Sequence, residues 1–139
     1  MTISPLHYVI ILIIIVGIDL SMILYINKNM YVDMLNNINK NSNIELSNLR
    51  VFSSAIIVYL LLTLSILLYV VQHENRNYIN IFINGFVLGI IIYGIYDCTN
   101  LATIKEFGIK EAFIDVVWGG LLCGLTSLSS KYIINNLHP

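Results

Sequence analysis

Long apolar stretches separated by shorter polar segments dominate the pattern of this chain. Four of the apolar stretches hold about 20 residues or more, the length at which a helix crosses the hydrocarbon core of a bilayer. They are residues 5–26, 51–71, 81–103 and 111–134. The pattern predicts an all-α fold, an integral membrane bundle of four transmembrane helices in up-down order. No linker divides the chain, so we expect a single membrane domain over residues 1–139.

The first stretch and the long polar loop after it need an interpretation of their own. Signal peptides have a basic start, a shorter apolar core and a small-residue cleavage site. Residues 5–26 have none of these, so we expect an uncleaved span. In the polar loop at 27–50, the short apolar segments 30–35 and 44–49 are too short to span. We expect them to form interfacial turns or to fold back on the bundle.

Small residues recur on the last two predicted spans, and in apolar helices they allow two backbones to approach closely. Gly85 and Gly89 form a GxxxG pair, and Gly94 follows on the same span. The fourth span adds a second group of small residues at Gly119, Gly120 and Gly124. We therefore expect a close-packing face on the third span and another small-residue face on the fourth.

The composition agrees with a membrane protein. Of the 139 residues, 58% are hydrophobic and 11% are charged, whereas soluble domains carry about 25% charged residues. The lipid bilayer is the expected partner. The net charge of −1 gives no basic field for nucleic acid. Cys98 and Cys123 fall in apolar stretches and lack metal-binding spacing, so we expect free thiols.

Lysine and arginine are unevenly distributed between the two ends of the predicted bundle. The segments 27–50 and 104–110 hold five of these residues, and the opposite side holds only Arg76 and Lys131. Because cytoplasmic loops carry an excess of positive charge, the count predicts a multi-pass protein with both termini on the non-cytoplasmic side.

Three aspartates interrupt the apolar stretches at similar depths. Asp19 and Asp97 each lie about seven residues before a span ends, which is about 10 Å below the surface at 1.5 Å per residue. Asp115 lies four or five residues into the last span, about 7 Å below the same surface. An up-down bundle would bring all three acids to one level. Lipid does not solvate such groups, so we expect them to face inward.

Other polar residues surround this level and define a candidate pocket. Asn100 shares a helical face with Asp97, and Trp118 shares one with Asp115. Thr99, Tyr93 and Tyr96 supply further polar groups. No lysine, arginine or histidine lies in the interiors of the spans to neutralise the acids. Neighbouring buried carboxylates repel one another, so we expect the cluster to share at least one proton at neutral pH.

Three interpretations of this pocket stay open. Asp19, Asp97, Asn100 and Asp115 could bind or conduct a proton or a small cation, since acids inside membranes are usually functional. Asp97, Asn100 and Asp115 could instead form a structural clasp that fixes the register of the helices. A membrane enzyme acting on lipid is the weakest interpretation, because the chain lacks a nucleophile–base pair, a phosphate loop and a histidine cluster. We expect no cofactor and no metal ion.

Two motifs resemble those of a known family. The run YDCTNLAT at 96–103 is followed by DVVWGGLL at 115–122. They are similar to the YDLTN-type and DxxWG motifs of domain-of-unknown-function family 2177, predicted four-helix membrane proteins. The matching residues are Tyr96, Asp97, Thr99, Asn100, Asp115, Trp118 and Gly119.

The resemblance extends to the other two spans. Residues 54–59 resemble the family's AxxxY segment, and Asp19 would correspond to an acid in the first helix. Cys98 stands where the family usually has leucine, and Phe107 stands near a usual tryptophan. The resemblance implies an integral membrane protein with no assigned activity, substrate or cofactor. A chain of four helices has little room for a pore of its own, so a conducting function would favour a homo-oligomer.

Overall fold

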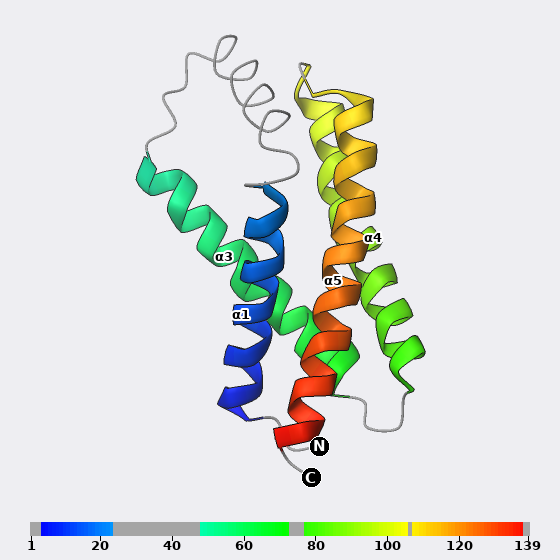
Figure 1. Cartoon of the computed structure of the whole chain (residues 1–139). Coiled ribbons are helices and arrows are strands. Elements are labelled where there is room, and N and C mark those ends of the chain that lie inside the picture. Colours follow the sequence, from blue (N-terminus) through cyan, green and yellow to red (C-terminus); the bar gives the residue numbers. More distant parts are fainter. Residues whose placement is uncertain (1–3, 24–47, 73–76, 106, 138–139) are drawn as a thin grey trace.

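The fold consists of helices that run alternately up and down (Figure 1). The computed structural model describes residues 4–23, 48–72, 77–105 and 107–137. Its elements, in chain order, are α1 (Pro5–Ser21), α3 (Asn48–Ile66), the π-helical turn η2 (Leu67–Val71), α4 (Tyr78–Thr103) and α5 (Ile109–Leu137). The prediction of an all-α, four-helix architecture is confirmed. The predicted end of the first span and the loop segments 30–35 and 44–47 lie outside the described residues.

The helices differ in their capacity to cross a bilayer. Among the described residues, three helical segments are long and apolar enough to do so: Phe52–Val71, Tyr78–Thr103 and Ile109–Asn136. Helix α1 is apolar but shorter, with 17 residues. It begins at the end of the bundle where α5 finishes (Figure 1), which we call the lower end. Asp19, Asp97 and Asp115 lie toward the opposite, upper end.

Local sequence fixes where the helices begin at the lower end. Ser4 caps α1 by accepting a hydrogen bond from the backbone N–H of Leu6, while Nδ1 of His7 accepts one from the backbone N–H of Ser4. Pro5 suits the first turn because it has no N–H to leave unpaired. Asn77 caps α4 by accepting bonds from the backbone N–H groups of residues 79 and 80. Side-chain oxygens at these positions satisfy helix donors that have no intrahelical partner.

Glycines allow α4 and α5 to pack as a close hairpin. A Cβ atom on Gly89 would overlap the backbone carbonyl of Gly119, and one on Gly85 would overlap the side chain of Ser127. Gly94 differs, since a Cβ atom there would meet nothing within 4 Å. The prediction of a close approach through the GxxxG pair is confirmed, and the approach lies on the part of α4 that contains Gly85 and Gly89.

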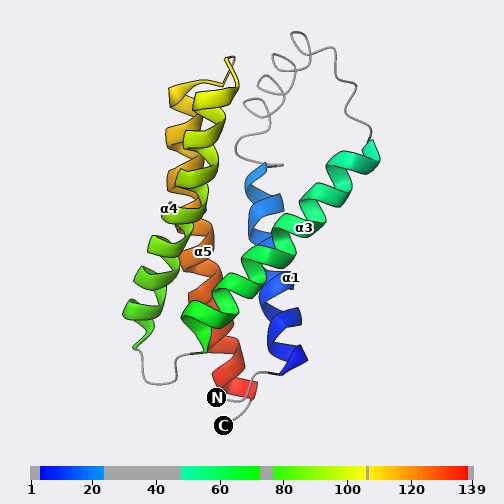
Figure 2. The same ribbon diagram turned by 180° about the vertical axis from the view of Figure 1, so that it is seen from behind.

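Helix α3 crosses α1 obliquely and leans away from the hairpin at its upper end (Figure 2). Its lower half packs into a core shared with α1 and α5, which contains Ile11, Ile15, Leu62, Ile66 and Leu122. Its first half is largely exposed: Phe52 is 66% exposed and Ile57 is 56% exposed. The upper half of α3 therefore presents apolar side chains that no other described residue covers.

The lower end of the bundle contains a buried lysine. Nζ of Lys131 on α5 donates a hydrogen bond of 3.3 Å to the carbonyl oxygen of Val71, at the end of η2. The ammonium group therefore bonds a carbonyl of the last helical turn, as lysine side chains near helix ends commonly do. Lys131 is only 3% exposed, although the sequence suggested a residue of the surface. The helix end and the buried cation stabilise each other.

Candidate functional site

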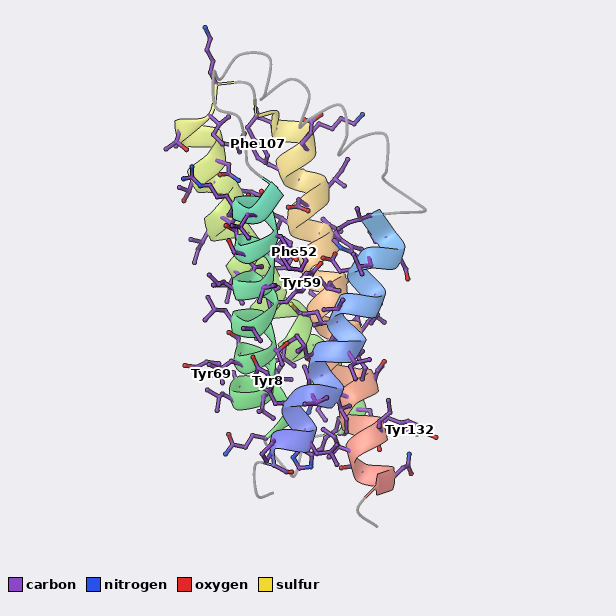
Figure 3. All side chains as sticks on the ribbon, turned by 90° about the vertical axis from the view of Figure 1, so that its left-hand side faces the viewer. Tyr8, Phe52, Tyr59, Tyr69, Phe107 and Tyr132 are labelled. Atoms are coloured by element: carbon purple, nitrogen blue, oxygen red, sulfur yellow. The ribbon has the colours of Figure 1, made fainter. Side chains whose placement is uncertain are left out.

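Asp19 joins three helices through its two carboxylate oxygens. Its Oδ2 accepts a hydrogen bond of 2.7 Å from the hydroxyl of Tyr59 on α3. Its Oδ1 accepts one of 2.9 Å from the indole Nε1 of Trp118 on α5. Figure 3 shows Tyr59 directed toward α1, whereas Tyr69 on the same chain segment points outward. Asp19 is therefore the link that fastens α3 and α5 to α1.

The surroundings of Asp19 match what a buried carboxylate requires. Each oxygen has a donor, and the side chain is only 9% exposed. Hydrogen bonds between helices in membranes contribute about 0.6–2 kcal/mol each. Together with its two donors, Asp19 forms an arrangement that fixes the register of the three helices; we call these three residues the Asp19 clasp.

Asp97 on α4 is more deeply buried than Asp19, but no hydrogen bond joins its carboxyl group to another described residue. The side chain is 1% exposed. Among the described residues, neither of its oxygens has a hydrogen-bond partner. The charge of Asp115, on the neighbouring helix α5, acts on it. We call Asp97 and Asp115 the acid pair, because the charge of Asp115 acts on Asp97 from the neighbouring helix.

Helical spacing relates the acid pair to the clasp. Trp118 lies three residues after Asp115 and therefore on the same face of α5, about one turn further on. Because Trp118 bonds Asp19, the acid of α1 and the acid of α5 lie at neighbouring levels of the bundle. Asp19 accepts hydrogen bonds from two aromatic residues, whereas the charge of Asp115 acts on Asp97, so the two acids have different environments.

The remaining polar residues of the candidate pocket differ in their exposure and in their contacts. Tyr93 lays its ring against Gly119, where a Cβ atom would overlap it. Tyr96 is 60% exposed on the outer face of α4. The hydroxyl of Thr99 donates to the backbone carbonyl of residue 95 at 2.7 Å, and Asn100 is half-buried at the upper end of α4. The structure therefore places the side chains of Tyr96 and Thr99 on the exposed side of α4.

Sequence reasoning missed Tyr59 as a partner of Asp19. The only signal was the AxxxY segment at 54–59, which ends at this tyrosine. It also missed the burial of His7, which is 3% exposed, near the lower end of α1. Neither burial nor partnership follows from residue type, because both depend on how α3 and α5 lie against α1.

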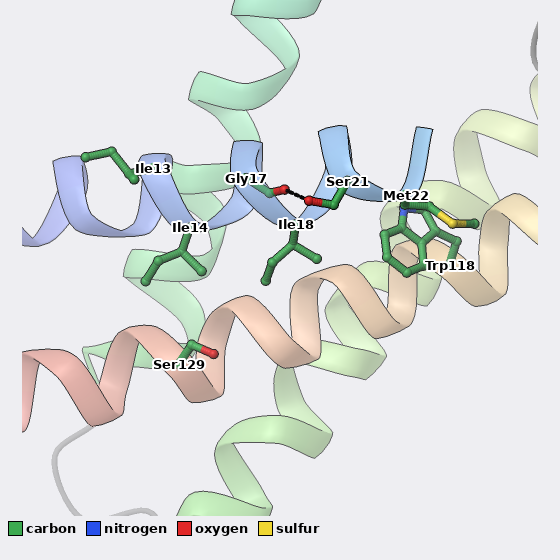
Figure 4. Close-up of a pocket in the computed structure, with 8 residues that line it drawn as sticks. All are labelled: Ile13, Ile14, Gly17, Ile18, Ser21, Met22, Trp118 and Ser129. Carbon is green, nitrogen blue, oxygen red and sulfur yellow. Dashed lines mark hydrogen bonds between the residues drawn. The ribbon is translucent and has the colours of Figure 1, made fainter. Parts of the chain in front are cut away.

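An open, largely apolar groove runs along the seam between α1 and α5 (Figure 4). Its volume is about 670 Å³. Trp118 closes one end of it, and Ile14 and Ile18 project into it from α1. The hydroxyl of Ser21 is turned back onto the carbonyl of Gly17 at 2.7 Å. Neither member of the acid pair lines the groove, but the groove adjoins the Asp19 clasp through Trp118.

The described residues offer little for a metal ion or a disulfide. They contain no group of three or more His, Cys, Asp or Glu side chains placed to hold a metal. Both cysteines are free thiols, with Cys98 exposed and Cys123 buried. Hard divalent ions require about six oxygen ligands, more than the two carboxylates of the acid pair supply.

The all-α architecture, with bilayer-length apolar helices and acids between them, defines a helical membrane protein. The chain belongs to the family described as predicted membrane protein (DUF2177), whose model matches residues 5–132. The resemblance carried by the two motifs is thereby confirmed. No curated protein and no solved structure matches the chain.

Proposed function

We propose that the acid pair, Asp97 with Asp115, binds a proton inside the membrane and that the protein carries protons across it. The single observation that supports this function is the state of Asp97. Its carboxyl group is 1% exposed and has no hydrogen-bond partner among the described residues, while a second acid acts on it. A charged group left in this situation is costly, and a bound proton removes the charge.

A proton suits the acid pair better than a divalent ion. Two carboxylates lack the six or so oxygen ligands that calcium or magnesium needs. Repulsion between them falls when one is protonated. Transport then requires only that a proton leave the Asp97 carboxyl toward one side and be replaced from the other side; no other bond changes. A small monovalent cation could occupy the acid pair in place of a proton. Measuring the flux of that cation directly distinguishes the two.

A structural function is the second candidate, and the Asp19 clasp favours it. Asp19 has a donor for each oxygen and ties α1, α3 and α5 together. On this alternative, the polar layer holds the helices in place, and Asp97 would be part of the same structural layer. The two candidates differ at Asp97, because a structural acid should contribute to stability and a proton-binding acid need not.

Transport by this chain would involve a homo-oligomer. Four helices enclose little space for a pore, and the upper half of α3 is exposed on the surface. Copies of the chain arranged about a common axis would cover this part of α3. In the proposed orientation, the segment 104–108 faces the cytoplasm and both termini face the other side, in keeping with the distribution of lysine and arginine.

The test is proton flux into proteoliposomes under an imposed membrane potential, with a pH-sensitive dye inside. The native protein should conduct protons, and D97N and D115N should each reduce the flux at least tenfold while the protein stays folded. E111Q is the matched control, since it makes the same chemical change in the first turn of α5 and should conduct normally. A parallel sodium-sensitive dye identifies a cation carrier.

Undiminished flux in D97N would contradict the proposal. No flux from the native protein, together with a loss of stability in both variants, would support the structural function instead.

A further inference from the structure

Three hydroxyl groups below the acidic residues are completely buried and lack partners. Thr63 on α3 and Thr126 and Ser130 on α5 are each 0% exposed. Within the described part of the chain, none of these hydroxyls has a hydrogen-bond partner. Most buried polar groups in proteins are bonded, and those that bond nothing in the protein are often satisfied by ordered water.

Helical spacing places the three hydroxyls on α3 and α5, below the Asp19 clasp. Ser130 follows Thr126 by one turn of α5, so these two residues share a face of that helix. Thr63 lies one turn beyond Tyr59 on α3 and so shares its face. Because Tyr59 and Trp118 both bond Asp19, Thr63 lies about one turn below the clasp on α3, and Thr126 lies about two turns below it on α5.

Helix α5 runs between the two polar ends of the bundle. Asp115 lies at its upper end and Ser130 near its lower end, about 22 Å apart at 1.5 Å per residue. Lys131, next to Ser130, is buried and bonds the carbonyl of Val71 at the lower end. The buried side chains of Leu122 and Cys123 lie between Trp118 and Thr126, and they separate the upper polar residues of α5 from its lower hydroxyls.

We propose that Thr63, Thr126 and Ser130 bind water in the interior of the bundle, and that this water carries protons along the lower half of the route between the acid pair and the lower end. Water supplies the donors and acceptors that the three hydroxyls lack. A hydrogen-bonded chain of hydroxyls and waters passes protons by exchanging them from one oxygen to the next, so each oxygen gains one proton as it loses another. The conducting part of this inference rests on the proposed function.

The first measurement concerns bound water and does not depend on transport. In the T126V/S130A variant, two hydroxyls are replaced by groups of similar shape. If the hydroxyls are hydrated, the substitution removes hydrogen bonds to water, and the melting temperature in bilayers should fall. If they are dry, removing unbonded polar groups should raise the melting temperature, which would overturn the inference.

The second measurement is proton flux in the same proteoliposome assay. T126V/S130A should conduct at least tenfold less than the native protein. S127A is the matched control: Ser127 is also buried on α5, but its hydroxyl donates to the carbonyl of Cys123, so its flux should equal that of the native chain. Full flux in T126V/S130A, with flux still lost in D97N, would overturn the water route and leave the proposed function standing. Absence of flux in the native protein would end both the proposed function and the conducting role, and the melting temperatures would still decide whether the hydroxyls bind water.

Discussion

At the scale of single residues, Asp19 and Asp97 have the same chemistry and opposite surroundings. Asp19 accepts a hydrogen bond on each oxygen, from Tyr59 and from Trp118. Asp97 is buried with neither oxygen bonded among the described residues. A donor for each oxygen offsets the cost of burying a carboxylate. A buried carboxylate without hydrogen bonds instead destabilises the folded protein for as long as it is charged. The two acids should therefore respond differently to the same substitution.

Replacing each acid by asparagine tests this difference. D19N should lower the free energy of unfolding by about 1–2 kcal/mol. The amide has one oxygen in place of two, so it can accept the bond from Tyr59 or from Trp118 in the native geometry but not both. D97N should leave the stability unchanged or raise it, because no hydrogen bond is lost. Denaturation in detergent, followed by the fluorescence of the single tryptophan, Trp118, measures both variants. Equal losses in the two would contradict the division of roles.

The hydroxyl of Tyr59 can be examined by itself. Y59F removes one of the two donors to Asp19 and should cost about 0.6–2 kcal/mol of stability. Y69F is the control on the same segment, since Tyr69 is 65% exposed and points away from the bundle. The account of the clasp fails if the two phenylalanine variants unfold at the same denaturant concentration.

At the scale of helices, glycine determines how closely α4 and α5 approach. Gly89 faces the backbone of Gly119, and Gly94, five residues later, faces open space. The pair is suited to a comparison, because both glycines lie in the same helix and the same substitution is made at each. Only the first should force the two helices apart.

G89A should destabilise the protein by about 1–3 kcal/mol, the usual cost of overpacking a close contact. G94A should be neutral or stabilise the protein by up to about 1 kcal/mol, since alanine favours helix more than glycine does. Thermal unfolding in detergent compares the two. A neutral G89A variant would mean that the α4/α5 contact adjusts without strain.

The close contact of α4 and α5 could be predicted from the sequence, but the clasp could not. Hydrophobic length and the spacing of small residues are local properties, so they indicated the helices and the contact at Gly89. The bond between Asp19 and Tyr59 depends on the oblique course of α3, which arises from packing of its lower half against α1 and α5. The same packing buries Lys131 and the hydroxyl of Thr126, both of which have ordinary positions in the sequence.

At the scale of the whole molecule, the alternating helices place the beginning of α1 and the end of α5 at one end. The distribution of lysine and arginine predicts that this end faces away from the cytoplasm. A phosphatase reporter that is active only outside the cytoplasm should therefore be active when fused after residue 139. The same reporter inserted between residues 104 and 109 should be inactive. The opposite pair of results would reverse the proposed orientation.

Self-association belongs to the same scale. If copies of the chain cover the exposed upper half of α3, chemical cross-linking in bilayers should give discrete oligomers at every ratio of protein to lipid. Random collisions would instead give products that disappear as lipid is added. A chain that remains monomeric at high dilution would remove the oligomer from the proposal.

The most direct test of the central claim is infrared spectroscopy of the protein in bilayers at neutral pH, because it detects the proton on the acid pair without requiring transport. The account predicts the carbonyl stretch of a protonated carboxylic acid that is absent in D97N and retained in D19N. A spectrum without this band, or a band lost in D19N and kept in D97N, would contradict the claim that Asp97 and Asp115 bind a proton.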